Sequence, residues 1–275
     1  MNPENPSANP IGVFDSGVGG LAVLQEIRRE LPGENLLYVA DSAHAPYGDK
    51  TSRQIEARSI AIAGFLVSQN AKAIVVACNT ASGAAVETLR ARFPLPIVAM
   101  EPAVKPAAAH TKTGVIGVLA TSRTITSDNF AKLHQRFGAG VRILMQACPG
   151  LVEQVEAGKL SGHETRALVE RYVLPLLEQQ ADTIVLGCTH YPFLAPLIRE
   201  IAGAAVTIMD PSPAIARELR RRLNGAALLS SETRPGSVRF WSSANSESNR
   251  RVISGLWKTE VELQLLPDNP GEASG

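Results

Sequence analysis

The chain has 275 residues, and its 45% hydrophobic and 5% aromatic content is typical of an ordinary globular protein with one or two modest domains. Its formal net charge is only +1 and its charges are interspersed, which excludes a basic footprint for nucleic acid or for an anionic membrane. No apolar run approaches the ~20 residues of a membrane span, and the polar start lacks the parts of a signal peptide, so we expect a cytoplasmic protein.

Short apolar runs alternate with helix-period segments along the chain, a pattern that predicts parallel βα units and hence an α/β fold. We expect residues 1–10 to be disordered. In the first stretch, the apolar runs predict strands at 11–14, 36–40, 73–77 and 97–100. The helices between these strands are predicted at 21–31, from Thr51, which forms a capping-box pattern with Gln54, and at 81–93.

The second stretch repeats this alternation. Its strands are predicted at 115–119, 141–145, 183–186 and 206–209. Its helices are predicted at 127–137, 162–179 and 194–202. Beyond it, the pattern predicts a helix to residue 223, strands at 237–242 and 259–265 around a helix at 249–257, and a disordered tail at 267–275.

A glycine-rich turn, FDSGVGGLA, follows the first predicted strand. Its G-x-G-x-x-A spacing at 17–22 fits the dinucleotide fingerprint, and Asp41 stands where a ribose-binding acid would be, so an NAD-dependent dehydrogenase is one alternative. The first glycine of that fingerprint usually follows the strand at once, whereas Asp15 and Ser16 intervene here. We therefore expect the glycines to let the backbone and Ser16 approach a carboxylate or ammonium group closely.

The chain contains a weak internal repeat. IVVACNTAS at 74–82 resembles IVLGCTHYP at 184–192, and IGVFDSG at 11–17 resembles IGVLATS at 116–122. Each half therefore has a polar loop after its first strand and a cysteine after a later strand. Because ligands bind at the carboxyl ends of strands in open α/β sheets, two halves that face each other would place these two cysteines on opposite sides of one small ligand.

Two opposed thiols can invert a carbon that carries an acidic proton: one thiolate removes the α-proton, and the opposite thiol returns one, without a cofactor. Cys78 and Cys188 each precede a predicted helix, where N–H groups and the helix dipole favour thiolate. By adjacency, we expect Asp15 to assist Cys78 and His190 to assist Cys188, so that loss of the imidazole impairs one direction more than the other. Cys148 is expected to be a buried thiol, and no cysteine pair has the spacing of a metal site.

Five motifs together carry a family resemblance: FDSGVGGL (14–21), PYG (46–48), ACNTAS (77–82), GVLAT (117–121) and GCTHYP (187–192). The set resembles the glutamate racemases of the aspartate/glutamate racemase superfamily over about residues 11–209. The resemblance implies interconversion of L- and D-glutamate without a cofactor, which supplies D-glutamate for bacterial peptidoglycan. It also implies a homodimer of chains with two similar α/β domains and an active site in the cleft between them.

Residue by residue, the resemblance implies that Cys78 and Cys188 are the catalytic cysteines, with Cys78 serving D-glutamate and Cys188 serving L-glutamate. The residues that assist them are Asp15, Glu156 and His190. The implied substrate-binding positions are Asp15, Ser16, Pro46, Tyr47, Gly48, Asn79, Thr80, Thr121, Thr124, Thr189 and His190. We expect some of these threonines, such as Thr80 and Thr189, to cap helices as well.

The resemblance also divides the chain. It suggests that the chain crosses to the second domain near residue 100 and returns near 209, which gives a first domain of 11–99 plus 210–266 and a second of 100–209. One departure is His44, which stands where the family loop often has arginine. In CPGLVEQVE, Glu153 competes with Glu156 for the assisting role, and we favour Glu156 from its distance after Cys148.

Three other functions fit parts of the pattern. An aspartate racemase or another amino-acid racemase of the same superfamily would use the same pair of cysteines. A two-lobed amino-acid-binding protein would bind without turnover, and it usually needs an export signal that we do not find. A dehydrogenase would leave the paired cysteine loops unexplained.

Overall fold

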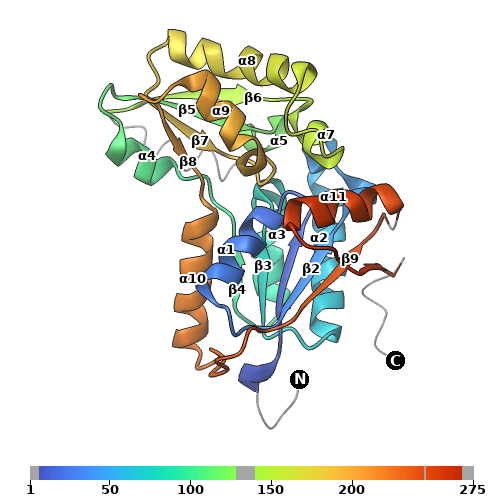
Figure 1. Cartoon of the computed structure of the whole chain (residues 1–275). Coiled ribbons are helices and arrows are strands. Elements are labelled where there is room, and N and C mark those ends of the chain that lie inside the picture. The colour runs from blue at the N-terminus through green and yellow to red at the C-terminus, as the bar shows by residue number, and fades with distance from the viewer. Residues whose placement is uncertain (1–5, 128–139, 245, 268–275) are drawn as a thin grey trace.

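The computed structural model describes residues 6–127, 140–244 and 246–267, and their strands form two sheets in which every pair of neighbours is parallel (Figure 1). The first sheet contains β1 (Ile11–Asp15), β2 (Leu36–Ala40), β3 (Ala73–Val76), β4 (Ile97–Ala99), β9 (Val238–Ser242) and β10 (Leu263–Leu265). Its order is β10-β9-β2-β1-β3-β4. The second sheet contains β5 (Val115–Ala120), β6 (Arg142–Ala147), β7 (Thr183–Leu186) and β8 (Thr207–Met209), in the order β6-β5-β7-β8.

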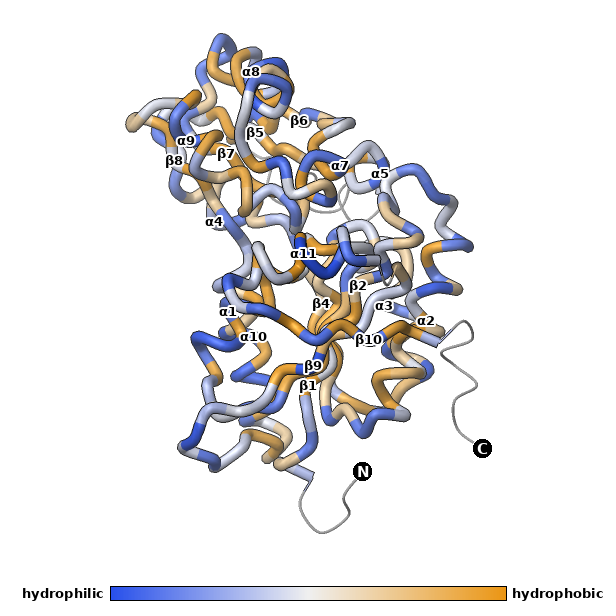
Figure 2. The backbone as a smooth tube through the Cα atoms, turned by 45° about the vertical axis from the view of Figure 1, so that its right-hand side comes forward, coloured by the Kyte–Doolittle hydropathy of each residue, from blue (hydrophilic) through white to orange (hydrophobic). Residues whose placement is uncertain are grey.

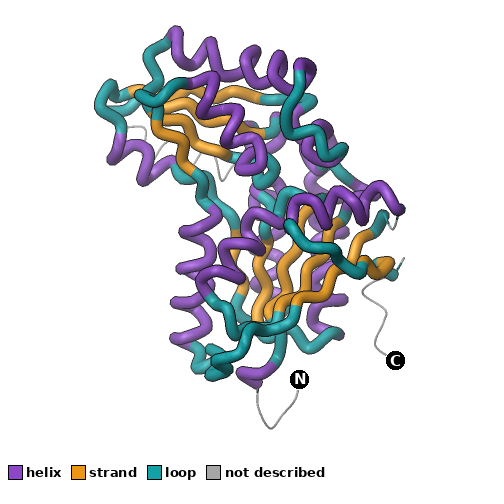
Figure 3. The backbone as a smooth tube through the Cα atoms, viewed as in Figure 1, coloured by secondary structure: helices purple, strands orange, loops and turns teal. Residues whose placement is uncertain are grey.

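Helices cover the sheets on both faces, which confirms the predicted α/β fold (Figure 3). Around the first sheet lie α1 (Leu21–Glu30), α2 (Ser52–Ser68), α3 (Asn79–Arg92), α10 (Ser212–Gly225) and α11 (Glu247–Trp257). Around the second lie α4 (Val104–His110), α5 (Ser122–Ile125), α7 (Leu151–Glu156), α8 (His163–Glu178) and α9 (Ala195–Ala202). Within the described residues, no helix is both long and apolar enough to span a membrane.

Short 3₁₀ turns complete the described elements: η1 (Pro6–Ala8), η2 (Ser42–His44), η3 (Tyr47–Asp49) and η4 (Tyr191–Leu194). The predicted strands are all present, β10 being shorter than expected, and the capping box at Thr51 forms as predicted. The short helices α4, α5 and α7 were not predicted, because four to seven residues show too little of the helical period. Most of the helix expected at 127–137 and the tail from 268 lie outside the described residues.

The strands of the first sheet are buried on both faces. Every residue of β1, β2 and β3 is buried, which explains why these strands read as continuous apolar runs in the sequence (Figure 2). Their side chains alternate between two cores: Val13 packs in the cluster that holds α1 and α10, and Phe14 packs in the cluster that holds α2 and α3.

The internal repeat is confirmed by the topology. The order β2-β1-β3-β4 in the first sheet matches β6-β5-β7-β8 in the second. Equivalent glycines occupy the first strand of each half, and each lies against a helix leucine: a Cβ at Gly12 would come 2.9 Å from Leu66 Cδ1, and one at Gly117 would come 2.7 Å from Leu176 Cδ1. Only glycine lets the helix approach the strand this closely.

Two segments join the sheets on one side of the molecule, between β4 and α4 and between β8 and α10 (Figure 1). After the second segment, β9 and β10 join the first sheet, and α10 and α11 pack against it. We therefore propose domains of residues 11–99 with 210–266 and of residues 100–209.

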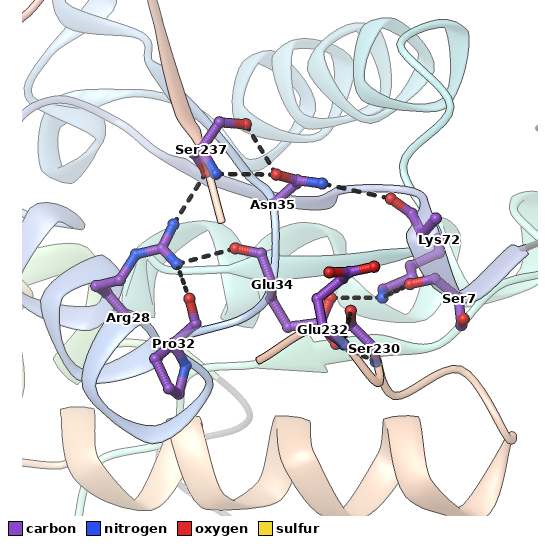
Figure 4. A network of polar contacts seen from close by, with 10 residues as sticks. Ser7, Arg28, Pro32, Glu34, Asn35, Lys72, Ser230, Glu232 and Ser237 are labelled. Atoms are coloured by element: carbon purple, nitrogen blue, oxygen red, sulfur yellow. Dashed lines mark hydrogen bonds and ion pairs between the residues drawn. The ribbon is translucent and has the colours of Figure 1, made fainter. Parts of the chain in front are cut away.

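The start of the chain is held by a buried ion pair at the amino end of the first sheet (Figure 4). The Lys72 ammonium pairs with Glu34 and also donates to the carbonyl oxygen of Ser7. Glu34 Oε1 accepts from the backbone N–H of Ser230, 2.8 Å away, so this pair also anchors the returning chain. Residues 6–10 are therefore ordered, and the expectation of disorder was wrong for them. Residues 1–5 lie outside the described residues.

Candidate active site

Polar loops from both sheets meet where the carboxyl ends of the strands face each other. Thr189, which follows β7, donates from Oγ1 to Asp15 Oδ1 at the end of β1, over 3.3 Å. Thr121, which follows β5, lies 3.1 Å from Thr80 through their hydroxyl oxygens. The predicted arrangement of two facing halves is therefore present, as the ends of open α/β sheets favour.

Cys78 lies at the end of β3 and is the N-cap of α3. Its sulfur accepts from the N–H of Ala81 at 3.4 Å, and its thiol donates to Ser16 Oγ at 3.7 Å. Ser16 Oγ in turn donates to Asp15 Oδ1 at 3.5 Å. Burial, followed by the nearby charge of Asp15, raises the pKa of the Cys78 thiol above its ordinary value. The helix start was expected to favour thiolate, but burial outweighs it and Cys78 is a thiol at rest.

Asp15 is fully buried and shapes the glycine-rich turn. Its Oδ2 accepts from the backbone N–H of Gly20 at 2.9 Å and from that of Gly17 at 3.3 Å. Burial raises the pKa of this carboxyl, although the charge of His190 and the N–H of Gly20 pull the pKa down. Asp15 is thus connected to Cys78 through Ser16 rather than by direct contact, so the two form a relay.

Cys188 follows β7 and faces an imidazole. Its sulfur lies 3.7 Å from His190 Nδ1, and His190 Nε2 lies 2.6 Å from Glu156 Oε1. Burial by itself would lower the pKa of His190, but the contacts with Cys188 and Glu156 hold this pKa well above its usual value. The ring is therefore an imidazolium paired with a carboxylate. The helix expected after Cys188 is first a 3₁₀ turn, η4, which contains Pro192.

Glu156, at the end of α7, also joins the two halves. Its Oε1 accepts from the backbone N–H of Val18 at 2.7 Å. Glu153 is exposed on the same helix, so the structure brings Glu156 and not its competitor to the imidazole.

The glycines of the turn make room for these residues. A Cβ at Gly17 would come 1.8 Å from Glu156 Oε1, and one at Gly19 would come 2.3 Å from His190 Nδ1. The carboxylate that approaches the turn closely is therefore the side chain of Glu156 and not a ligand. The N–H groups of Gly17, Val18 and Gly20 bond to Asp15 and Glu156, and are not presented to a nucleotide phosphate.

A cluster of hydroxyl groups forms at Thr80, two residues after Cys78. Thr80, Thr121 and Thr124 form a triangle with oxygen separations of 3.0 to 3.2 Å, and Thr121 also accepts from the N–H of Thr124 as the N-cap of α5. Neither Thr80 nor Thr189 caps a helix, contrary to expectation: both hydroxyls reach across to the other half. Next to Thr80, both polar side-chain atoms of buried Asn79 lack a partner among the described residues, so this amide is available to a ligand.

The PYG segment reaches the site through its backbone. A Cβ at Gly48 would lie 3.2 Å from Thr121 Cβ, so the segment packs directly against the second half. The Tyr47 side chain, however, is buried and donates from its hydroxyl to Asp41 Oδ2 at 2.6 Å, while Pro46 precedes it in extended backbone. His44 also contacts Asp41, with Nδ1 3.0 Å from Oδ1. The sequence did not predict this use of Asp41.

The site residues are buried together: Cys78 is 4% exposed, Cys188 is 7% exposed, and Ser16, Thr189 and His190 are less exposed than Cys188. Two thiols thus lie in one enclosed site, each with a separate chain of polar groups. Cys188 is close enough for its charge to act on the pKa of Cys78. Thiols that are bonded to buried polar groups in this way are suited to proton transfer.

Comparison with known proteins identifies similar chains. The family model for Asp/Glu/Hydantoin racemase matches residues 11–219. The chain is 54% identical over 258 residues to the glutamate racemase of Pseudomonas paraeruginosa (strain DSM 24068 / PA7), which covers 94% of this chain and 97% of that protein.

Solved structures agree with this similarity. The glutamate racemase from Francisella tularensis subsp. tularensis SCHU S4, in complex with D-glutamate, has a TM-score of 0.82 at 29% identity and covers 95% of this chain and 98% of that one. The Escherichia coli glutamate racemase, solved with L-glutamate and an activator, has a TM-score of 0.83 at 31% identity and covers 94% and 97% of the two chains.

Proposed function

The chain belongs to the Asp/Glu/Hydantoin racemase family, and we propose that it interconverts L- and D-glutamate by transfer of the α-proton between two cysteines. The observation that carries this proposal is the pair of buried thiols, each with its own proton relay: Cys78 with Ser16 and Asp15, and Cys188 with His190 and Glu156.

The proposed reaction needs one thiolate and one thiol. In the L-to-D direction, the Cys188 thiolate takes the α-proton, and the electron pair left on the α-carbon is delocalised into the carboxylate. The Cys78 thiol then gives its proton to the opposite face, which leaves Cys78 as thiolate and Cys188 as thiol. The D-to-L direction runs the same steps in reverse, so no cofactor is required.

The protonation of the groups around the thiols supports these roles. The raised pKa of Cys78, caused by burial and by Asp15, suits a thiol that donates a proton to the carbanion formed from L-glutamate. The imidazolium of His190 places a positive charge beside Cys188, which supports the proposed proton-abstracting role of this sulfur.

Substrate recognition is assigned to the polar groups around the sulfurs. The unpartnered amide of Asn79 and the hydroxyls of Thr80, Thr121 and Thr124 are donors for a carboxylate. Ser16 and Thr189 offer further hydroxyls beside the thiols. Through their backbone, Pro46, Tyr47 and Gly48 complete the proposed pocket next to Thr121. An aspartate racemase with the same two thiols is the second candidate, distinguished by substrate length.

The biological setting follows from the family. We propose that the D-glutamate formed supplies peptidoglycan synthesis and that the chain acts as a homodimer. The mass of the protein in solution, by light scattering at enzyme-assay concentrations, tests the second point.

The proposed reaction is tested by incubating the reduced protein, without added cofactor, with L-glutamate in D₂O. Loss of optical rotation with entry of deuterium at the α-carbon, followed by NMR, is the expected result. Aspartate is the parallel substrate, and faster exchange with aspartate would favour the second candidate. A folded protein with free thiols that exchanges neither amino acid would overturn the proposal.

A further inference from the structure

Asp41 lies at the end of β2, and its backbone N–H donates to the carbonyl oxygen of Asp15 at 3.0 Å. We propose that Arg58, Asp41 and Tyr47 form a clamp that positions the PYG segment against Thr121 and thereby sets the affinity for the amino acid. This inference deepens the proposed function and rests on it. These residues are positioning residues, since none of them belongs to the two polar relays of the thiols.

The clamp is built around one fully buried carboxylate. Arg58, on α2, donates to both oxygens of Asp41, with Nε 2.9 Å from Oδ2 and Nη2 2.7 Å from Oδ1. The Tyr47 hydroxyl adds its bond of 2.6 Å to Oδ2. A bidentate guanidinium and a phenol fix both the position and the orientation of a carboxylate, which a lysine ammonium cannot do.

The charge state of the clamp is set by these same bonds. Burial alone would raise the pKa of Asp41, but the hydrogen bonds from Arg58 and Tyr47 hold this pKa below its ordinary value. Asp41 therefore stays ionised at neutral pH. The other groups that face it are His44, from the same loop, and Ser243, after β9.

The clamp connects to the active site by three steps. Tyr47 is 1% exposed and is held by Asp41, which fixes the first residue of η3. Gly48, the next residue, packs on Thr121 of the second half. Thr121 bonds to Thr80 and Thr124, which are in the proposed substrate pocket. A loosened clamp therefore acts first on the contact between the two halves at the substrate, because the relay side chains make no hydrogen bond to a clamp member.

This path predicts an effect on binding rather than on chemistry. The relays Cys78–Ser16–Asp15 and Cys188–His190–Glu156 contain no member of the clamp. The variants Arg58→Lys and Tyr47→Phe are therefore expected to raise KM for both enantiomers by about tenfold, the effect of one lost hydrogen bond to a charged group. We expect kcat to change less than about threefold, because binding that is lost equally in ground and transition states leaves kcat unchanged.

The matched control is Lys72→Arg. Lys72 and Glu34 form another buried ion pair at the amino end of the first sheet (Figure 4). The site lies at the opposite, carboxyl end of the strands. Exchange of the cation there tests whether any disturbance of a buried pair in this sheet is enough to raise KM. The unfolding temperature of each variant is measured beside its kcat and KM.

A second readout does not depend on turnover. The rate at which iodoacetamide alkylates Cys78, measured by peptide mass spectrometry, reports how well the halves close over this thiol. We expect faster alkylation in Arg58→Lys and Tyr47→Phe than in the wild type or in Lys72→Arg. Equal rates in all four proteins would overturn the clamp.

The outcomes separate the clamp from the proposed function. Raised KM with kept kcat in the two clamp variants, and wild-type KM in Lys72→Arg, support the clamp. A loss of kcat with unchanged KM, or the same KM rise in Lys72→Arg, overturns it. A wild-type protein that does not racemise glutamate overturns the proposed function, and the alkylation rates then decide on the clamp alone.

Discussion

Gly17→Ala is expected to lower the activity of the enzyme without weakening either sheet. A Cβ at this position would lie 1.8 Å from Glu156 Oε1, whereas real Cβ contacts do not fall under 3.0 Å, so the carboxylate has to retreat by about 1.2 Å, the difference between these distances. That retreat breaks the bond from Val18 N–H to Glu156. Losing such a charge-assisted bond costs ~1.5–3 kcal/mol, which, if the bond holds Glu156 in the active arrangement, lowers kcat/KM by roughly ten- to hundredfold.

The assay is racemisation of L-glutamate, with Gly255→Ala as the control. Gly255 lies within α11 and a Cβ there meets nothing within 4 Å, so this variant should keep full activity and gain slightly in stability. Combining Gly17→Ala with Glu156→Asp shortens the acid by roughly 1.5 Å and should recover part of the loss, as expected for coupled residues. Wild-type kcat/KM in Gly17→Ala would refute the reasoning, because it would mean that the contact between turn and carboxylate is dispensable.

Four further substitutions test other parts of the structure. Cys78→Ala and Cys188→Ala should each abolish racemisation while unfolding at the wild-type temperature, and near-normal turnover in either would refute the two-thiol mechanism. Burial lowers the pKa of His190, but its contacts with Cys188 and Glu156 raise this pKa above 6.5. The charged imidazole therefore stabilises the fold fully below that pH, and this stabilisation is lost as the pH rises through the folded-state pKa. Glu156→Gln should make the fall in the free energy of urea unfolding between about pH 6 and about pH 9 smaller, and an unchanged fall would contradict this. Lys72→Met leaves Glu34 buried without its cation and should lower the free energy of unfolding by ~3–5 kcal/mol. The kcat/KM per folded molecule should stay unchanged. A loss under ~1 kcal/mol in a denaturant titration would show that the ion pair is not needed for stability.

The fold was predictable because its strands carry local signals. β1, β2 and β3 are buried along their whole length, so each is a continuous apolar run in the sequence. The repeat of glycine in the first strand of each half marks the close approach of a helix, as at Gly12 and Gly117. These features depend on the strand itself and its nearest helix, and sequence patterns report such features well.

The charge state of Cys78 was not predictable in the same way. Its place before a helix is visible in the sequence, and the structure confirms Cys78 as the N-cap of α3. The depth of its burial and the position of Asp15, 63 residues earlier in the chain, are properties of the tertiary structure. Both raise the pKa of the thiol, so the local prediction of a thiolate was wrong for this cysteine.

The role of Tyr47 shows a similar limit. A family motif draws attention to its position, and a substrate contact is the simplest reason for a motif. In the structure, the Tyr47 hydroxyl donates to Asp41. Asp41 also accepts from Arg58, which lies on α2, 17 residues after Asp41 in the chain. Sequence spacing does not predict such a triad, because the three residues come from a strand end, a turn and a helix face. The PYG backbone, rather than the phenol, is therefore the part that faces the second half.

The two halves share one strand order but surround their thiols with different polar groups. Thermodynamics limits which kinetic constants can differ between the two directions as a result. Enantiomers have equal free energies in water, so kcat/KM has to be the same in both directions for the wild type and for every variant. Loss of the imidazole in His190→Asn, which removes the cation that contacts Cys188, should therefore lower kcat/KM equally in both directions. The asymmetry has to appear as unequal changes in kcat, balanced by changes in KM, measured with each enantiomer by circular dichroism. Equal changes of kcat in the two directions would mean that His190 does not distinguish the thiols.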